Sequence, residues 1–341
     1  MSVESLTLLI CTHNGRNKLE GTLQSIAELK VPKGLSVELL IVDNNSNDGT
    51  DKIALDYWNS LGNPYKLEVI KEYKQGKAHA LCRGYDYARG DLIILCDDDN
   101  WLDKEYLNQV LNLFNTKSDI GLAGGVGRQA VFTNKIEPAW FDKFKWRYMV
   151  ETHHKRNGYL VKNDYSIYGA GSVLKKSVWS VLSKAGFKFQ NYTKKAIAED
   201  LELSMAVAFS GNKLYFNDQL TFVHDLRWGR LSIENLKQQE KLNGKCGIYP
   251  IVYELIYHRI GSNFLFFRFL KHYLITVFEV KQQLQKLKTK KLQKDNIIAE
   301  VDFVRVSSTY KNMVLMLPIV IFKYPTIKRW IQRLVEHSKA L

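Results

Sequence analysis

The first hundred residues alternate between short, continuously apolar runs and segments with helical periodicity. Apolar runs lie at 6–11, 37–42 and 92–96, and apolar residues recur at helical spacing in the segments between them. A strand that is apolar on both faces has to be covered by helices on both sides, as in a parallel sheet built from strand–helix–strand units. The sequence therefore predicts an α/β fold with a mostly parallel central sheet flanked by helices.

Charge is distributed unevenly along the 341 residues. Residues 1–224 carry 28 basic and 26 acidic side chains, a net charge of +2, whereas residues 225–341 carry 21 and 9, a net charge of +12. We predict a catalytic domain over residues 1–245 and a basic, helical C-terminal region over 246–341. The excess of lysine should attract an anionic partner. Because no nucleic-acid-binding motif accompanies it, we expect that partner not to be a nucleic acid.

The C-terminal region contains an aromatic segment interrupted by charges. Phe264–Phe278 is too charged to span a bilayer, and lysines follow it as far as Lys294. This composition favours an amphipathic helix lying on an anionic membrane surface, with Met313–Phe322, split by Pro318, as a second apolar segment. The alternative is a helix that packs on the catalytic domain or on a second subunit of a homodimer.

Cysteine usage and the N-terminal residues bear on the cellular compartment. The four cysteines form no CxxC pair, and no basic segment precedes the short first apolar run. Reduced cysteines are typical of cytosolic proteins, and a signal peptide would begin with a basic segment. We therefore expect a cytoplasmic protein, peripheral on the cytoplasmic face of the membrane if the C-terminal region binds lipid.

Carboxylates follow directly after two of the apolar runs. Asp97, Asp98 and Asp99 come after the run at 92–96, and Asp43 comes after the second run. Ligands of open α/β sheets bind at the carboxyl ends of the strands. Three adjacent anions repel one another unless they share a cation, and hard divalent cations prefer carboxylate and phosphate oxygens. The triplet therefore indicates a Mg²⁺ or Mn²⁺ site, with a solvated acidic loop as the alternative.

Asp43 has two interpretations of its own. Its carboxylate could accept a hydrogen bond from the ring N–H of a nucleobase flanked by Thr12 and His13, or it could simply close an Asx turn. No GxGxxG sequence follows the first apolar run, which argues against dinucleotide-binding dehydrogenases and against methyltransferases.

Five motifs occur in a recognisable order along the chain. They are Leu8 to Asn14 (LLICTHN), Ile41 to Thr50 (IVDNNSNDGT), Lys77 to Gly84 (KAHALCRG), the acidic triplet 97–99, and Ala198 to Leu201 (AEDL). Taken together, and over roughly residues 5–245, the sequence resembles the family 2 inverting glycosyltransferases of the GT-A fold. It departs from the usual pattern at His79 and Cys82, where asparagine is often seen, and at Asp103, where proline often follows the acidic motif.

The resemblance implies transfer of a sugar from a nucleotide diphosphate sugar to a hydroxyl of a glycan or lipid-linked acceptor, as in surface polysaccharide assembly. A UDP-sugar is the expected donor. Asp97 and Asp99 would take the DxD role, one contacting the ribose and one binding the metal on the diphosphate. The other residues implied to contact the nucleotide are Cys11, Thr12, His13, Asp43, Asn45, Lys77, Arg83 and Asp98.

Glu199 and Asp200 correspond to the acidic pair that supplies the catalytic base in the family. A carboxylate beside the anomeric carbon can take the proton of the attacking hydroxyl, although Asp200 could instead cap the helix that follows. His224 resembles a late histidine that some members bring to the metal or diphosphate, and Arg230 could balance diphosphate charge. For the acceptor, the candidate residues are Trp140, Gly169, Ala170 and Gly171, with simple packing as the alternative.

Two other functions remain open at this point. A sugar nucleotidyltransferase would need a glycine-rich, lysine-bearing phosphate loop after the first strand, and Asn14-Gly15-Arg16 is a poor match to it. A non-catalytic sugar-nucleotide or glycan-binding protein would be expected to have lost acids at 97–99 or at Asp200, and both motifs retain them.

Overall fold

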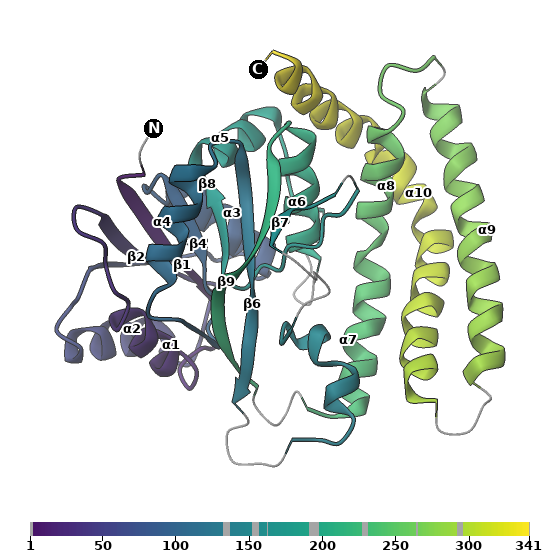
Figure 1. Cartoon of the computed structure of the whole chain (residues 1–341). Coiled ribbons are helices and arrows are strands. Elements are labelled where there is room, and N and C mark those ends of the chain that lie inside the picture. Colours follow the sequence, from purple (N-terminus) through teal and green to yellow (C-terminus); the bar gives the residue numbers. More distant parts are fainter. Residues whose placement is uncertain are drawn as a thin grey trace.

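The computed structural model describes residues 3–131, 137–151, 157–161, 163–190, 198–226, 231–263, 265–291 and 296–340. These residues form a nine-stranded mixed sheet in the order β3-β2-β1-β4-β8-β6-β9-β5, with β7 added on β9 (Figure 1). The strands are β1 (Ser5–Thr12), β2 (Ser36–Asp43), β3 (Lys66–Lys71), β4 (Leu92–Leu95), β5 (Asn100–Leu102), β6 (Ile120–Val131), β7 (Gly158–Tyr159), β8 (Ser172–Lys175) and β9 (Lys213–Asp225).

Helices cover both faces of this sheet and extend beyond it. They are α1 (Leu19–Ala27), α2 (Thr50–Ser60), α3 (Lys77–Tyr87), α4 (Tyr106–Thr116), α5 (Lys176–Ala185), α6 (Glu199–Phe209), α7 (Ile233–Cys246), α8 (Ile248–Tyr257), α9 (Leu265–Lys291) and α10 (Ile297–Lys339). The predicted α/β class with a helical C-terminal extension is confirmed. Strands β3, β2, β1 and β4 are parallel, whereas β8 runs antiparallel to its neighbours.

Alternate residues of β1 enter two separate cores. Leu8 and Ile10 pack with α1, α2 and α4 on one face, and Leu9 packs with α3, α5 and α6 on the other. This follows from the strand period of two, which sends successive side chains to opposite faces. The continuous apolar run at 6–11 is therefore explained by burial on both sides, as the sequence predicted.

The parallel strands end along one edge of the sheet, and this edge carries the acids. Thr12 is paired in register with Asp43 at the ends of β1 and β2, and β4 ends two residues before Asp97. The chain returns to the same edge before β8, where the backbone N–H of Gly171 donates to the carbonyl of Leu95 over 2.9 Å. Gly171 has φ +66°, a left-handed conformation that disfavours other residues.

The C-terminal helices pack on one another and on the catalytic fold. Figure 1 shows α7, α10 and α9 side by side, with the C-terminal end of α10 reaching back toward α5. Gly244 of α7 permits this close approach, because a side chain there would meet the backbone carbonyl of Arg305. The predicted boundary at residue 245 falls in the last turn of α7, and the division of the chain at that point stays a prediction.

Pro318 does not split the C-terminal segment as the sequence suggested. Helix α10 continues through both Pro318 and Pro325, held by buried side chains such as Val320 and Tyr324. Tertiary packing here outweighs the lost backbone hydrogen bonds. No helix within the described ranges is at once long and apolar enough to cross a membrane.

Trp330 anchors the C-terminal end of α10, and its removal tests this packing. The indole is 2% exposed, and its ring centroid lies 5.3 Å from that of Phe187 and 5.1 Å from that of Tyr253. We expect Trp330→Ala to lower the free energy of unfolding by about 3–5 kcal/mol. The measurement is urea denaturation.

Phe322→Ala serves as the matched control for this prediction. Phe322 lies on the same helix and is 84% exposed, so its truncation should change stability by less than about 0.5 kcal/mol. Equal stability of the two variants would contradict the docking of α10 on the catalytic fold.

Candidate active site

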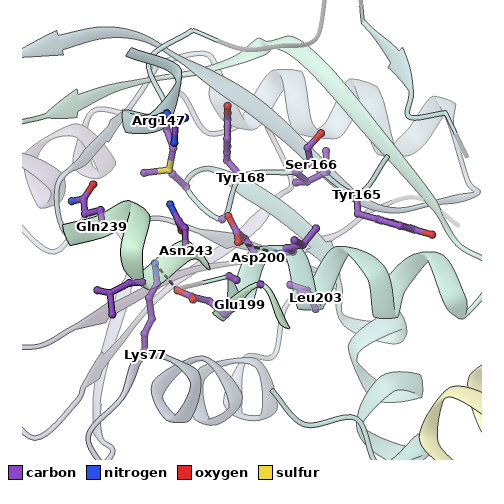
Figure 2. Close-up of a pocket in the computed structure, with 18 of the residues that line it drawn as sticks. Lys77, Arg147, Tyr165, Ser166, Tyr168, Glu199, Asp200, Leu203, Gln239 and Asn243 are labelled. Carbon is purple, nitrogen blue, oxygen red and sulfur yellow. Dashed lines mark hydrogen bonds and ion pairs between the residues drawn. The ribbon is translucent and has the colours of Figure 1, made fainter. Parts of the chain in front are cut away.

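One cavity of about 860 Å³ lies at the carboxyl edge of the sheet. The acidic triplet, the first residue of α3, the Gly169-Ala170 turn and the start of α6 line one side of it. Residues of α7, α9 and α10 line another side, as do side chains of the short 3₁₀ helix Lys145–Tyr148. Figure 2 shows Gln239 and Asn243 of α7, together with Arg147, around the cavity. The structure therefore brings both predicted acidic motifs to one cavity.

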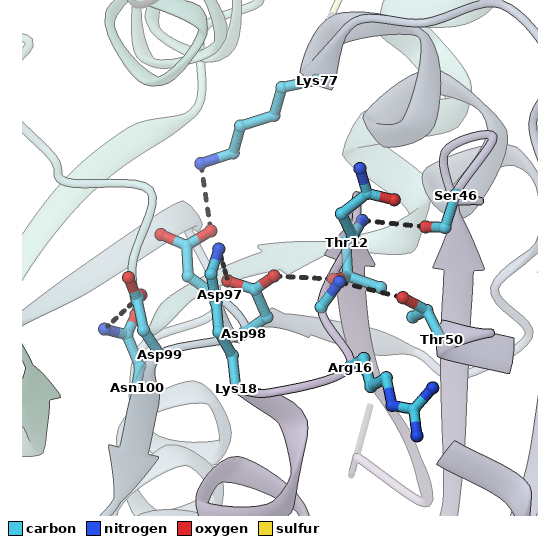
Figure 3. A network of polar contacts seen from close by, with 12 residues as sticks. Thr12, Arg16, Lys18, Ser46, Thr50, Lys77, Asp97, Asp98, Asp99 and Asn100 are labelled. Atoms are coloured by element: carbon cyan, nitrogen blue, oxygen red, sulfur yellow. Dashed lines mark hydrogen bonds and ion pairs between the residues drawn. The ribbon is translucent and has the colours of Figure 1, made fainter. Parts of the chain in front are cut away.

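Lys77 links the two acidic motifs. Its Nζ lies 3.0 Å from Oδ1 of Asp97 and 3.5 Å from Oε1 of Glu199 (Figures 2 and 3). Burial by itself would lower the pKa of Lys77, but these carboxylates outweigh it and raise the pKa well above its ordinary value. A permanent cation is thus fixed between the triplet and the pair.

Asp98 is held by neighbouring protein groups. The hydroxyl of Thr12 donates to its Oδ2 over 2.6 Å, and Nζ of Lys18 lies 3.5 Å from its Oδ1 (Figure 3). Burial raises the pKa of Asp98, Lys18 and Thr12 oppose the rise, and Asp99 adds to it. The middle carboxylate therefore ties the end of β4 to the end of β1.

Asp99 faces His224, which lies near the end of β9. Nδ1 of His224 lies 2.6 Å from the carbonyl oxygen of Tyr148, so it carries the proton and donates it. Nε2 has no hydrogen-bond partner among the described residues and lies 3.6 Å from Oδ1 of Asp99. A cation placed between this nitrogen and the carboxylate would contact both.

These groups fit a divalent cation that also takes ligands from its substrate. The described residues contain no group of three His, Cys, Asp or Glu side chains gathered for a metal. Mg²⁺ and Mn²⁺ sites that serve nucleotides commonly take only one or two carboxylates, completed by phosphates and water. A ligating histidine typically donates its other ring N–H to a carbonyl, as His224 does to Tyr148.

The predicted base-binding residues lie beside the cavity with local partners. Asp43 is buried, and its Oδ1 accepts from the backbone N–H of Ser46, three residues further on, over 3.0 Å, so the carboxylate makes a local turn contact. Nδ1 of His13 lies 2.9 Å from the carbonyl oxygen of Asn44. Asn45 is exposed in a left-handed conformation.

Of two further residues predicted to contact the nucleotide, one lines the cavity and the other does not. Cys11 lines the cavity, and burial raises the pKa of its thiol, so the thiol stays neutral. Arg83 is exposed on α3 and is not among the residues that line the cavity. The structure thus brings Cys11 to the acids and leaves Arg83 apart from them.

Glu199 and Asp200 open α6 and face the cavity. Asp200 accepts from the backbone N–H of Leu201 over 2.8 Å, and Gly169 also stabilises its charged form. Burial nevertheless raises the pKa of both Glu199 and Asp200; Asp200 adds to the rise at Glu199, and Asp97 adds to the rise at both. A buried carboxylate that lies in a cleft and has a raised pKa is typical of a catalytic acid or base.

The acceptor candidates divide between the cavity and the core. Gly169 and Ala170 line the cavity. Gly171 follows them in the chain, is outside the cavity lining, and donates its backbone N–H to the carbonyl of Leu95. Trp140 is outside the cavity lining and packs with Phe141, Phe144 and Tyr148. Arg230 lies outside the described residues.

The sequence did not indicate that the C-terminal helices contribute residues to the cavity. Gln239 and Asn243 of α7, Gln283 of α9, and Arg305 and Thr309 of α10 line the cavity, as do Trp146 and Arg147. Their positions depend on tertiary packing, and no local motif marks them. The one available signal was the Trp146-Arg147 pair, an aromatic next to a cation in a loop-rich segment.

Solved structures of two glycosyltransferases share this fold. A mannosyltransferase from Pyrobaculum calidifontis, solved with GDP-Man and Mn²⁺, matches 99% of this chain and 88% of its own with a TM-score of 0.55 and 15% identity. TarS residues 1–349 from S. aureus, solved with UDP-GlcNAc, matches 100% and 92% with a TM-score of 0.53 and 16% identity. Both likenesses show the fold of this chain, which is of the GT-A type.

The chain belongs to glycosyl transferase family 2, whose family model matches residues 7–182, just over half of its length. It is also similar to a dolichol-phosphate mannosyltransferase from Pyrococcus furiosus, 29% identical over 39% of this chain and 35% of the relative. A poly-beta-1,6-N-acetyl-D-glucosamine synthase from Staphylococcus epidermidis is 26% identical over 36% and 28%. The chain spans about a third of the length of such curated relatives.

Proposed function

We propose that this chain is a metal-dependent inverting glycosyltransferase that moves a sugar from a nucleotide diphosphate sugar to an acceptor hydroxyl. One observation carries the proposal: both acidic motifs face a single cavity, and Lys77 lies between Asp97 and Glu199 at 3.0 and 3.5 Å. The relatives solved with UDP-GlcNAc and with GDP-Man and Mn²⁺ support this assignment. A UDP-sugar is the donor to test first, as in surface polysaccharide assembly.

Asp200 is the proposed catalytic base. The acceptor oxygen attacks the anomeric carbon, its proton passes to the Asp200 carboxylate, and the bond from the anomeric carbon to the diphosphate oxygen breaks. Burial raises the pKa of Asp200, which makes its carboxylate, when ionised, a stronger base. Glu199 supports it by holding Lys77 in place.

The leaving diphosphate departs toward the acidic triplet. Asp99 and His224, with Asp97 beside them, would hold Mg²⁺ or Mn²⁺ together with the diphosphate oxygens. When bound, the metal supplies Lewis-acid stabilisation of the leaving group. Lys77 places a positive charge between the two acidic motifs, where it can stabilise the negative charge that develops on the leaving diphosphate during transfer.

The proposed function is tested by screening nucleotide sugars for release of the nucleoside diphosphate, with and without Mg²⁺ or Mn²⁺. We expect release from one donor class, enhanced by metal and abolished by a chelator. Formation of a nucleotide sugar from a nucleoside triphosphate and a sugar 1-phosphate would favour a nucleotidyltransferase. Donor binding without any turnover would favour a non-catalytic binding protein.

A membrane-facing surface is the second part of the proposal. Helix α9 exposes the apolar residues Phe267, Leu274, Ile275 and Phe278, and α10 exposes Val314, Leu315, Ile319 and Phe322. The same helix α9 also exposes lysines at 271, 281, 286, 288, 290 and 291. Exposed apolar side chains combined with lysine are the composition of interfacial helices on anionic lipid.

We expect the protein to bind vesicles containing anionic phosphatidylglycerol, measured by co-sedimentation. Salt should weaken this binding without abolishing it, because lysine attraction is screened and apolar burial is not. The double variant Phe267→Ser, Phe322→Ser should lose most of the binding that persists at high salt. No vesicle binding, or a dimer in solution that the same variant dissociates, would contradict the membrane assignment.

A further inference from the structure

We propose that the acceptor is a neutral carbohydrate, and that the wall of the cavity formed by α7 and α10 binds it. This inference rests on the proposed function and extends it to the identity of the acceptor. Figure 2 shows Gln239 and Asn243 of α7 around the same space as Lys77 and Asp200. The wall therefore stands where an acceptor hydroxyl would approach the proposed base.

The wall presents neutral hydrogen-bonding groups. Gln239 and Asn243 of α7 contribute amides and Thr309 of α10 contributes a hydroxyl, while Gln283 of α9 adds a further amide to the cavity lining. Nδ2 of Asn243 donates to Oε1 of Glu240 over 2.7 Å, which fixes the orientation of its amide. An amide both donates and accepts, which is what a sugar hydroxyl needs from its partners.

Aromatic rings complete the wall. Tyr168 and Trp146 line the cavity, and the hydroxyl of Tyr168 donates to the carbonyl oxygen of Trp146 over 3.3 Å. The guanidinium of Arg147 lies 4.4 Å from the centroid of the Trp146 ring and packs over its face. Aromatic side chains offer the flat apolar surface on which sugar rings pack, next to the polar groups that bind their hydroxyls.

The cations of the C-terminal wall are neutralised by protein carboxylates. Arg147, 7% exposed, is paired with the buried Glu240 and lies 2.8 Å from Oδ1 of Asp302. Nε of Arg305 lies 3.4 Å from Oε2 of Glu240, and its Nη2 lies 3.5 Å from Oδ1 of Asp302. The remaining cations of the cavity lining, Lys18 and Lys77, are paired with the acidic motifs, so each cation in the described lining already has an anionic partner.

The ion pairs of the wall argue against an acceptor with a phosphate at this place. Arg147 and Arg305 are already held by Glu240 and Asp302, so a phosphate bound against this wall could pair with either guanidinium only in competition with these carboxylates. A neutral sugar needs no cation and uses the amides.

The cavity is large enough for both substrates. Its volume of about 860 Å³ lies toward the upper end of the range of roughly 300–1,000 Å³ for small-molecule sites. A donor at the acidic triplet would therefore leave the space beside α7 and α10 for an acceptor sugar.

The test measures acceptor binding separately from catalysis. Neutral di- and trisaccharides of glucose, galactose, mannose and N-acetylglucosamine, and the same sugars carrying a phosphate, are compared by saturation-transfer difference NMR with the full-length protein. We expect at least one neutral sugar to bind more tightly than its phosphorylated counterpart. Gln239→Ala and Asn243→Ala should each weaken that binding by about tenfold, as the loss of one hydrogen bond worth about 1.4 kcal/mol would.

Gln238→Ala is the matched control. Gln238 is also a glutamine on α7, but it is exposed and lies outside the cavity lining, so its truncation should leave sugar binding unchanged. Donor affinity and slow donor hydrolysis without acceptor are measured on the wild-type protein and on Gln238→Ala, where they should be equal. Failure of donor binding or hydrolysis in the wild-type protein would count against the proposed function and not against this inference. Tighter binding of the phosphorylated sugars, no binding of any neutral sugar, or an equal loss in Gln238→Ala would overturn it.

Discussion

Replacing Asp200 with asparagine is expected to lower the rate of sugar transfer by about 10²–10⁴-fold, the usual contribution of a catalytic base. Asparagine has the same shape and can still accept from the N–H of Leu201, so the start of α6 should persist. It cannot take the proton of the acceptor hydroxyl. The affinity for the donor should therefore change little, and the loss should fall on the chemical step.

Single-turnover kinetics and donor titration together measure this prediction. Glu202→Gln gives a contrasting control on the same helix, because Glu202 is outside the cavity lining and accepts from Tyr253 and Gln190. That variant should have a lower free energy of unfolding but an unchanged rate of the chemical step. A drop in donor affinity equal to the drop in rate for Asp200→Asn would identify Asp200 as a structural cap.

The Asp99→Ala variant should lose metal-dependent donor binding and about 10³-fold in turnover, since Lewis-acid stabilisation of several kcal/mol corresponds to a factor of ten for each ~1.4 kcal/mol. Oδ1 of Asp99 lies 3.6 Å from Nε2 of His224, so the substitution removes the carboxylate that would share a cation with this imidazole. The measurement is a Mn²⁺ titration followed by electron paramagnetic resonance, with the nucleoside diphosphate present.

Asp103→Ala provides the matched control for the metal experiment. Asp103 is an exposed carboxylate four residues further along the chain, so its loss should leave Mn²⁺ binding intact. The Asp99→Ala protein should remain folded by circular dichroism. Unchanged Mn²⁺ affinity in that variant, or wild-type activity in the presence of a chelator, would contradict the assignment of Asp99 to the metal.

The sequence alone was sufficient for the parallel part of the sheet and for its acidic edge. The runs at 6–11, 37–42 and 92–96 are apolar on both faces because their side chains enter the cores on both sides of the sheet. Once those strands are parallel, Asp43 and the triplet 97–99 must lie at the same edge. Local pattern therefore fixed both the fold class and the position of the acids.

The composition of the opposite wall could not be predicted in this way. The helical pattern of 233–246 shows that one face is buried, but not that its Gln239 and Asn243 would meet Asp200. The same limit applies to Trp140, which resembled a sugar platform and packs in an aromatic cluster, while Trp146 lines the cavity. Which aromatic faces a cavity depends on contacts distant in sequence, here the ion pairs of Arg147 with α7 and α10.

The most direct test of the central claim is a proton NMR time course of the donor identified by the screen, with a neutral oligosaccharide acceptor and metal. We expect the anomeric signal of the donor to disappear while a new glycosidic signal of opposite anomeric configuration grows with the released nucleoside diphosphate. The Asp200→Asn protein should show this conversion only at a greatly reduced rate. A product with retained configuration, or conversion that proceeds equally well without Asp200, would contradict inverting transfer at this site.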